Sequence, residues 1–214
     1  MLIKLQNTCA DYNAKLVAVS KTKPNAKIMD LYDQGQRAFG ENRVQELVDK
    51  HRSLPDDIKW HMIGHLQKNK VKYIAPFVNL IHSVDSLSLL QTINKEAKKN
   101  DRIIQVLLQV KIATEDTKFG SDKEELNELI MESTRLDHTS VIGVMGMATF
   151  TDDVAQVRKE FKSLKYTYND MKNRHFSEDD SFKEISMGMS GDYKIGLDEG
   201  STMIRIGSLL FGAR

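Results

Sequence analysis

Eight short apolar runs recur along the chain, and segments with helical periodicity separate them. Each run has the length of a strand, and continuous apolar character is typical of a strand covered on both faces. Strands that alternate with helices predict an α/β fold with a parallel sheet. The even strand count and compact spacing favour a single (β/α)8 TIM barrel over an open doubly wound sheet. The predicted strands are residues 16–20, 38–40, 60–63, 80–82, 103–110, 141–145, 182–187 and 203–206.

The bulk properties predict one soluble domain. No linker-like change of composition divides the 214 residues, so we expect a single domain over residues 1–214. The 31 basic and 30 acidic residues give a net charge of +1, which offers no general electrostatic case for nucleic acid or an anionic membrane. No window approaches the roughly 18 apolar residues of a membrane span, and residues 1–13 lack the apolar region of a secretory signal. The single cysteine, Cys9, suits a reducing cytoplasm.

Several local signals predict where helices begin and end. Gly35 is expected as the C-cap of the helix after the first strand, and Asp85 as the N-cap of the helix after the fourth. Ser121 and Glu124 have the spacing of a capping box at the start of another helix.

A long apolar stripe lies between the sixth and seventh predicted strands. Its residues step by three and four from 154 to 171, which fits either a helix packed on its own sheet or a seam for a partner helix. The first alternative is favoured because it needs no second chain. Residues 173–181 are polar and are predicted to form a loop.

The stretch LVAVSKTKP, residues 16–24, joins the first predicted strand to a helix. Pro24 suits a first helical turn, so Lys21 is expected at the carboxyl end of a core strand, where α/β barrels and sheets bind ligands. Partial desolvation there lowers the pKa of an amine and frees the lone pair that Schiff-base chemistry requires. A solvated surface lysine is the alternative for Lys21. Lys23 either lowers that pKa further by charge repulsion or is itself a surface residue.

Two glycine-containing segments follow the seventh and eighth predicted strands. They are SMGMSGD, residues 186–192, and MIRIGS, residues 203–208. Loops at these positions often hold a phosphate in TIM barrels, because glycines allow close backbone approach and serines add hydroxyl donors. Ordinary tight turns are the alternative. The residues expected at this phosphate site are Gly188, Ser190, Gly191, Gly207 and Ser208.

Other polar residues are expected near the same end of the barrel. Arg205 lies inside an apolar strand, where a buried guanidinium needs a partner. Asn42 leaves the second strand and either binds a ligand or caps the next helix, and Lys118 after the fifth strand either reaches the barrel mouth or is solvated. His61 and His65 have helical metal-ligand spacing, but they straddle a strand end and a glycine. We therefore expect a core or pocket-lining histidine and no metal site.

The motifs LVAVSKTKP, FGENRVQE, WHMIGHLQKNK, GMS and GSTMIRIGSLLFGAR together resemble the pyridoxal phosphate homeostasis protein family, from about residue 15 to the end. The resemblance implies a barrel similar to the N-terminal domain of alanine racemase, which holds pyridoxal 5′-phosphate (PLP) on a lysine. Lys21 would form the Schiff base, Asn42 would line the ring, and Arg205 would face the pyridine nitrogen. The residues implied for the phosphate are Ser190 of the GMS motif, Gly207 and Ser208, and Met189 of the same motif is implied as a further cofactor-binding residue.

The same resemblance implies a PLP carrier in vitamin B6 homeostasis, with effects on amino acid pools, rather than an enzyme. An arginine opposite the pyridine nitrogen disfavours ring protonation, which makes PLP a poorer electron sink. The partners implied are PLP itself and apo forms of PLP-dependent enzymes, and the chain is expected to be a monomer. The alternatives are a PLP-dependent racemase or decarboxylase, and a barrel that binds another phosphorylated metabolite without covalent chemistry. A second PLP site on other lysines is left open.

Overall fold

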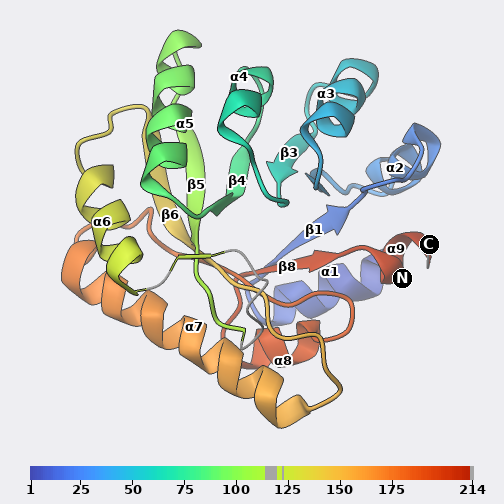
Figure 1. Ribbon diagram of the computed structural model, residues 1–214. Helices are drawn as coiled ribbons and strands as arrows, with labels where there is room; N and C mark the ends of the chain where they lie inside the picture. Colours follow the sequence, from blue (N-terminus) through green and yellow to red (C-terminus); the bar gives the residue numbers. More distant parts are fainter. Residues whose placement is uncertain (114–119, 122, 213–214) are drawn as a thin grey trace.

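The chain folds into a closed barrel of eight parallel strands, joined in sequence order from β1 to β8, with β8 pairing to β1 (Figure 1). The computed structural model describes residues 1–113, 120, 121 and 123–212. The predicted (β/α)8 TIM barrel is confirmed. The strands are β1 (Lys15–Val19), β2 (Ala38–Glu41), β3 (Lys59–Met62), β4 (Leu80–Val84), β5 (Ile104–Gln109), β6 (Thr139–Met145), β7 (Glu184–Ser186) and β8 (Met203–Ile206).

Helices surround the barrel, and each crossover returns the chain to the amino end of the next strand (Figure 1). None of the helices in the described ranges is long and apolar enough to cross a membrane. The helices are α1 (Leu2–Asp11), α2 (Asn25–Tyr32), α3 (Val44–Ser53), the 3₁₀ turn η1 (Lys68–Lys70), α4 (Val71–Ile74), α5 (Leu87–Lys99), α6 (Lys123–Ser133), α7 (Val154–His175), α8 (Tyr193–Asp198) and α9 (Ser208–Phe211).

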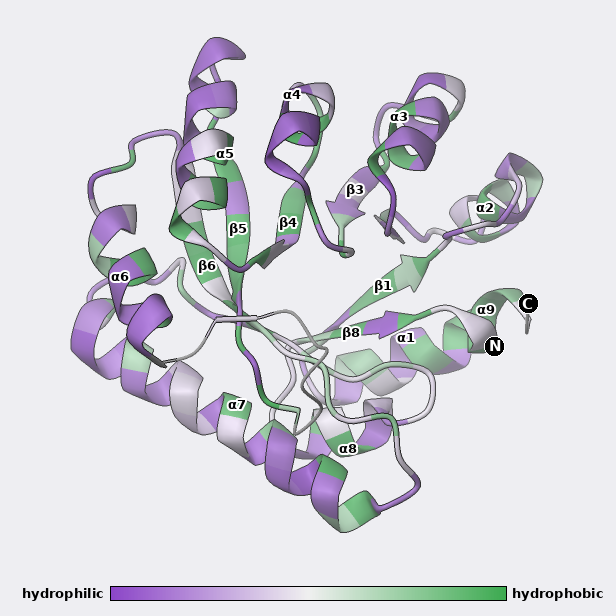
Figure 2. Ribbon diagram, in the orientation of Figure 1, coloured by the Kyte–Doolittle hydropathy of each residue, from purple (hydrophilic) through white to green (hydrophobic). Residues whose placement is uncertain are grey.

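Two apolar layers hold the barrel together. The outer layer lies between strands and helices, and it includes the α7 stripe, in which Val157, Phe161, Leu164 and Met171 are buried. The stripe therefore packs on the chain's own sheet. In Figure 2, β1 and β4 are mostly hydrophobic, whereas β3 and β8 carry hydrophilic segments, which match Lys59 and His61 in the sequence of β3 and Arg205 in that of β8. The inner layer fills the middle of the barrel and consists of Val17, Leu80, Leu107, Ile142, Met145 and Met203.

The two-residue alternation of each strand decides which side chains enter the barrel. Along β1, Lys15 lines a cavity at the amino ends of the strands, Val17 lies in the inner layer, and Val19 lines a cavity at the carboxyl ends. Along β8, Met203 lies in the inner layer and Arg205 reaches the carboxyl-end cavity. Each inward row therefore connects one end of the barrel to the other.

Several predicted boundaries are wrong, and competing contacts explain them. Asp85 is not the N-cap of α5, because α5 begins after Ser86 and the Asp85 carboxylate lies 3.5 Å from Nδ1 of His65. Ser121 does not cap α6, which begins at Lys123. Its N–H instead donates to the Gln109 carbonyl (2.8 Å) and extends the barrel past β5.

Other boundaries differ by a few residues. The C-cap of α2 is Asp33, while Gly35 follows in a left-handed turn (φ +93°). Helix α7 continues to His175, so only the later part of residues 173–181 is loop, and β7 is shorter than the predicted strand over residues 182–187. Helix α8 was not predicted from the sequence, because six residues are too few to show the apolar periodicity of a helix.

Candidate functional site

A cavity of about 400 Å³ opens at the carboxyl ends of the strands. All seven residues predicted for the cofactor line it, together with Lys23 and Gly191. Lys118 lies outside the described residues. The side chains and loops come from the ends of β1, β2, β7 and β8, which are far apart in sequence. The residues that the sequence predicted are Lys21, Asn42, Met189, Ser190, Arg205, Gly207 and Ser208.

The turn that carries Lys21 is held on both sides by a buried ionic cluster. Before the lysine, the Ser20 hydroxyl donates to Oε1 of Glu41 (2.6 Å) and the Ser20 carbonyl accepts from Nζ of Lys50 (2.8 Å). After it, the N–H of Thr22 donates to Oε1 of Glu46 (2.6 Å). Thr22 has a φ of +64°, a left-handed conformation that is costly for a β-branched residue. The cluster therefore fixes the backbone from which Lys21 projects.

Lys50 is the centre of that cluster. Its Nζ lies 2.7 Å from Oε1 of Glu41 and 2.7 Å from Oε1 of Glu46. The Lys50 side chain is only 6% exposed, and Glu41 is fully buried. Burial raises the pKa of the Glu41 carboxyl, and the hydrogen bonds from Lys50 and Ser20 oppose that shift. Sequence reasoning missed Lys50, because a lysine in a helix is usually solvated.

The loops after β7 and β8 are bound to each other. The Gly207 N–H donates to the Ser190 hydroxyl (3.3 Å), and the Arg205 N–H donates to the Gly188 carbonyl (3.0 Å). Gly188 has a φ of +91°, and a Cβ atom there would lie 3.0 Å from Cα of Tyr193. Glycine therefore permits both the left-handed turn and the close approach of α8. These contacts fix the rim of the cavity that we predicted to hold a phosphate.

Arg205 is buried, yet its partners are neutral. Its guanidinium donates to the Ser186 carbonyl (2.8 Å), the Ser186 hydroxyl (2.6 Å) and the Gly146 carbonyl (3.1 Å). Burial lowers the pKa of this guanidinium to about 10, with Asp192 acting in the opposite direction, so it stays a cation at neutral pH. The buried guanidinium thus has the partners that the sequence required, and they are carbonyls and a hydroxyl rather than a carboxylate.

A row of hydrogen bonds continues from Arg205 into the barrel. The Ser186 hydroxyl lies 3.0 Å from Nδ1 of His82, and Nε2 of His82 lies 3.0 Å from Nδ1 of His61. Burial lowers the pKa of His61 to about 3 and that of His82 well below its ordinary value, so both rings are neutral at pH 7. His61 is a hydrogen-bonded core histidine, one of the two roles expected for it.

His65, by contrast, lies away from the core and near Asp85. Within the described ranges, no group of three or more histidine, cysteine or acidic side chains is arranged to hold a metal ion.

Apart from Asp192 and Gly212, the remaining walls of the cavity are apolar, and these apolar residues were missed from the sequence. Val19 and Ile63 come from the inward rows of β1 and β3, and Met147 and Phe150 follow β6. The two-residue alternation identifies Val19 and Ile63 once the strand register is known, but nothing in the sequence separates Met147 from an ordinary core methionine. Asn42 enters the cavity beside Gly64, where a Cβ atom would lie 2.5 Å from the Asn42 carbonyl oxygen.

Comparison with known proteins identifies the family. The family model for the alanine racemase N-terminal domain matches residues 2–214. The pyridoxal phosphate homeostasis protein of Aquifex aeolicus is 38% identical, with 100% of this chain and 95% of the relative aligned. The chain belongs to the pyridoxal phosphate homeostasis protein family. The Escherichia coli member is 34% identical over 93% of this chain and 85% of its own length.

Solved structures agree with this assignment. PipY of Synechococcus elongatus without PLP matches with a TM-score of 0.92 and 34% identity, covering 99% of this chain and 98% of PipY. PipY with PLP bound matches with a TM-score of 0.85 and 33% identity, covering 94% of this chain and 93% of PipY. Alanine racemase of Bartonella henselae, at 18% identity and a TM-score of 0.69, covers 97% of this chain and 57% of its own and shares the fold.

Proposed function

We propose that this protein binds PLP at the carboxyl-end cavity, with Lys21 as its Schiff-base partner, and serves in PLP homeostasis. The observation that carries the proposal is the convergence of an amine, a buried guanidinium and two glycine-serine loops on one cavity. Its volume of about 400 Å³ falls within the range of about 300–1,000 Å³ typical of small-molecule sites. The solved PipY structure with PLP bound supports the choice of cofactor.

Each part of the cavity suits one part of PLP. Lys21 supplies an amine that condenses with an aldehyde to give an imine and water. Ser190, Gly207 and Ser208 supply hydroxyl and backbone donors for a phosphate. Arg205 supplies a cation toward the ring, and Val19 and Ile63 supply apolar contacts. Asn42 and Met189 complete the lining on either side.

The same lining favours a carrier over an enzyme. PLP supplies an electron sink to enzymes when its ring nitrogen is protonated, and a cation such as Arg205 opposes that protonation. Racemisation also needs a proton donor on each face of the bound amino acid. No tyrosine or histidine belongs to the described lining of this cavity. We therefore propose that the protein holds and releases PLP, and thereby influences amino acid pools, without efficient turnover.

The test is a spectroscopic titration of the wild type with PLP, followed by borohydride reduction and mass measurement. We expect visible Schiff-base absorbance and one added PLP on the peptide that contains Lys21. Lys21→Ala should lose both. Lys23→Ala is the matched control, because Lys23 lines the same cavity and donates to the carbonyls of Phe211 and Gly212. A wild type without an adduct would instead support a barrel that binds another phosphorylated metabolite.

The carrier role and the enzyme alternative are separated by two further measurements. PLP-loaded protein mixed with an apo PLP-dependent enzyme should restore that enzyme's activity while the carrier's own absorbance falls. Amino acids incubated with the loaded protein in deuterated water should keep their α-protons. Enzyme-like exchange rates would favour a racemase or decarboxylase.

We also propose a cytoplasmic monomer. The buried α7 stripe supports it, because that face is occupied by the chain's own barrel. Light scattering of the purified protein at several concentrations tests the monomer, and a constant mass of about one chain is the expected result.

A further inference from the structure

A second cavity, of about 710 Å³, lies at the opposite end of the barrel, where the strands begin. Its lining is rich in cations that come from different strands. Lys15 and Lys59 are the first residues of β1 and β3, while Arg37 and Lys183 directly precede β2 and β7. The amino ends of TIM-barrel strands usually serve stability rather than ligand binding, so this collection of cations needs an explanation.

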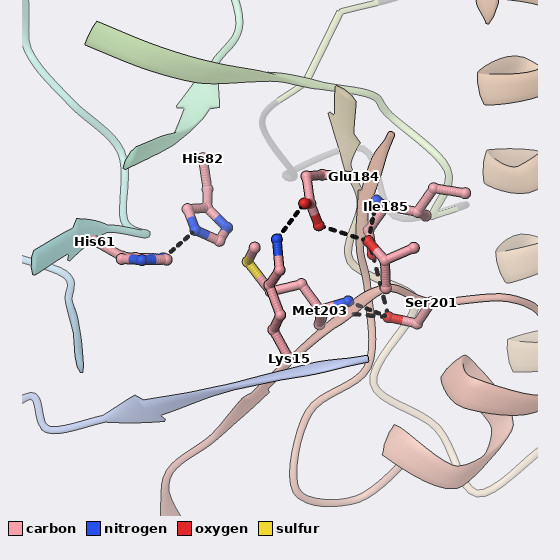
Figure 3. A network of polar contacts seen from close by, with 8 residues as sticks. Lys15, His61, His82, Glu184, Ile185, Ser201 and Met203 are labelled. Carbon is pink, nitrogen blue, oxygen red and sulfur yellow. Dashed lines mark hydrogen bonds and ion pairs between the residues drawn. The ribbon is translucent and has the colours of Figure 1, made fainter. Parts of the chain in front are cut away.

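The cations of this cavity outnumber its carboxylates. Lys15 forms an ion pair with the buried Glu184, and Figure 3 shows its amine extending toward that carboxylate. Arg37 lies 2.8 Å from the carboxylate of Asp57. Four cations against Glu184 and Asp57 leave two positive charges, those of Lys59 and Lys183. Within the part of the chain that the structure describes, neither of these lysines forms an ion pair. The cavity therefore carries an uncompensated positive charge.

The floor of the cavity contains an imidazole with one ring nitrogen left without a protein partner. His61 lines the cavity, is only 7% exposed, and turns Nδ1 toward His82 (Figure 3). Among the described residues, none forms a hydrogen bond with Nε2 of His61, and this nitrogen is not one of their fully buried polar atoms without a partner. It is therefore open to the cavity, where water or a ligand can form a hydrogen bond with it.

The hydrogen bonds from Arg205 through Ser186 and His82 to His61 determine whether Nε2 of His61 carries a proton. A guanidinium only donates, so the Ser186 oxygen accepts from Arg205, and the sole described acceptor for the Ser186 proton is Nδ1 of His82. His82 must then donate from Nε2 to Nδ1 of His61, which puts the His61 proton on Nε2. The opposite arrangement would leave the Ser186 proton buried without an acceptor. The nitrogen that faces the cavity is therefore a hydrogen-bond donor.

We propose that this amino-end cavity binds a phosphate dianion, either inorganic phosphate or the phosphate group of a small metabolite. Lys59 and Lys183 supply the charge, and Nε2–H of His61 supplies a directed hydrogen bond at the floor. Lysines are effective point charges for phosphate. A phosphate monoester has a second pKa of about 6 and is therefore mostly a dianion at pH 7, whereas inorganic phosphate is a mixture of monoanion and dianion at that pH. The inner layer, with Val17 and Leu107, separates this site from the carboxyl-end cavity.

The experiment is a titration of the full chain with inorganic phosphate, followed by calorimetry and by the imidazole NMR signals of His61. It is run on protein as purified and on PLP-loaded, borohydride-reduced protein, so that a phosphate site at the carboxyl end is counted separately. We expect a Kd of ~1 mM or tighter and a shift of the His61 Nε2–H signal in both samples. Sodium chloride at equal ionic strength should not shift it. Glycerol phosphate as a second ligand shows whether a phosphate monoester is accepted as well as the free ion.

Variants assign the binding to this cavity. Lys59→Met with Lys183→Met should weaken phosphate binding at least tenfold. Lys159→Met with Lys162→Met is the matched control, because these two exposed lysines of α7 lie outside the cavity, and its affinity should equal that of the wild type. Equal losses in both double variants, or binding without a His61 shift, would overturn the proposal. A wild type that binds phosphate here but forms no PLP adduct would leave this site standing and remove the proposed function alone.

Discussion

The two ends of the barrel are lined by the same inward rows of residues, yet they offer ligands different chemistry. At the carboxyl end, short residues such as Ser190, Gly191 and Gly207 line the cavity, so that the backbone can approach a ligand closely. At the amino end, Lys15 and Lys59 fill the corresponding positions with long flexible cations. Backbone donors are fixed in direction, whereas lysine amines supply charge with little shape. The comparison teaches that the carboxyl end can recognise a molecule, while the amino end recognises a charge.

Each end also contains a lysine–glutamate pair, and the pairs differ in burial. Lys50 and Glu41, beneath the Lys21 turn, are both withdrawn from solvent. Lys15 is 60% exposed, and only its partner Glu184 is buried. A buried pair loses more when one partner is removed, because the remaining charge has neither water nor a counterion. The unfolding free energy lost when each lysine is removed therefore measures how much more deeply the carboxyl-end pair is buried than the amino-end pair.

The largest effect is expected for Lys50→Met. Removing this amine leaves Glu41 buried without a counter-charge, which costs about 3–5 kcal/mol of unfolding free energy. Urea denaturation of the wild type and the variant measures the loss. The double variant Lys50→Met with Glu41→Leu should recover most of it, since neither charge remains. A loss below about 1 kcal/mol, as for a surface pair, would show that the two ends do not differ in this way.

The next effect concerns pH and the His61 ring. Its pKa in the folded protein is about 3, below its ordinary value of 6.5, so below pH 6.5 the unfolded chain binds more protons than the folded one. Stability should fall as the pH falls from 6.5 toward 3, by about 1.4 kcal/mol per pH unit from this group.

The charged groups that act on this ring are Lys15 of β1 and Lys59 of the same strand, β3, and both favour the neutral ring. His61→Asn should reduce the slope of unfolding free energy against pH between 6.5 and 4.5 by that amount. His65→Asn is measured beside it as a histidine variant outside the barrel interior, because 42% of that side chain is exposed. Equal slopes in the wild type and His61→Asn would contradict a neutral buried His61.

The smallest effect is expected for Lys15→Met at the amino end. This lysine is mostly exposed, so solvent already screens its attraction to Glu184, and the loss should stay within about 1 kcal/mol. Glu184 keeps a hydrogen bond from the Thr202 hydroxyl (2.8 Å), which limits the cost of losing the lysine. Urea denaturation beside Lys50→Met makes the measurement. A loss as large as that of Lys50→Met would mean that both pairs act as buried pairs.

The sequence predicted the barrel because apolar runs and helical periodicity are local properties. It also predicted Lys21, Ser190 and Arg205 around one cavity, because glycines and a buried arginine at strand ends are visible without coordinates. The Lys50 cluster could not be found in this way. Its meaning depends on α3 packing so that one amine reaches both the Ser20 carbonyl and Glu41, which is a tertiary contact.

Boundaries failed for the same reason. Ser121 has capping-box spacing, but its N–H donates to the carbonyl of Gln109 at the end of β5. Only the folded barrel brings these two residues together. His82 looked like an ordinary strand residue, and its role depends on facing both His61 and Ser186 inside the barrel. Local patterns therefore predicted the elements and the mouth residues, while partners across the barrel required the fold.

The row from Arg205 to His61 also has an electrical consequence. Every hydrogen bond in it donates in one direction, from the carboxyl end toward the amino end, so the bond dipoles add rather than cancel. The sum of these bond dipoles has its positive end at Nε2–H of His61. Ser186→Ala would remove the middle hydrogen bonds of the row and allow both imidazoles to exchange tautomers. Arg205 at the carboxyl end therefore determines which ring nitrogen of His61 carries the proton at the amino end.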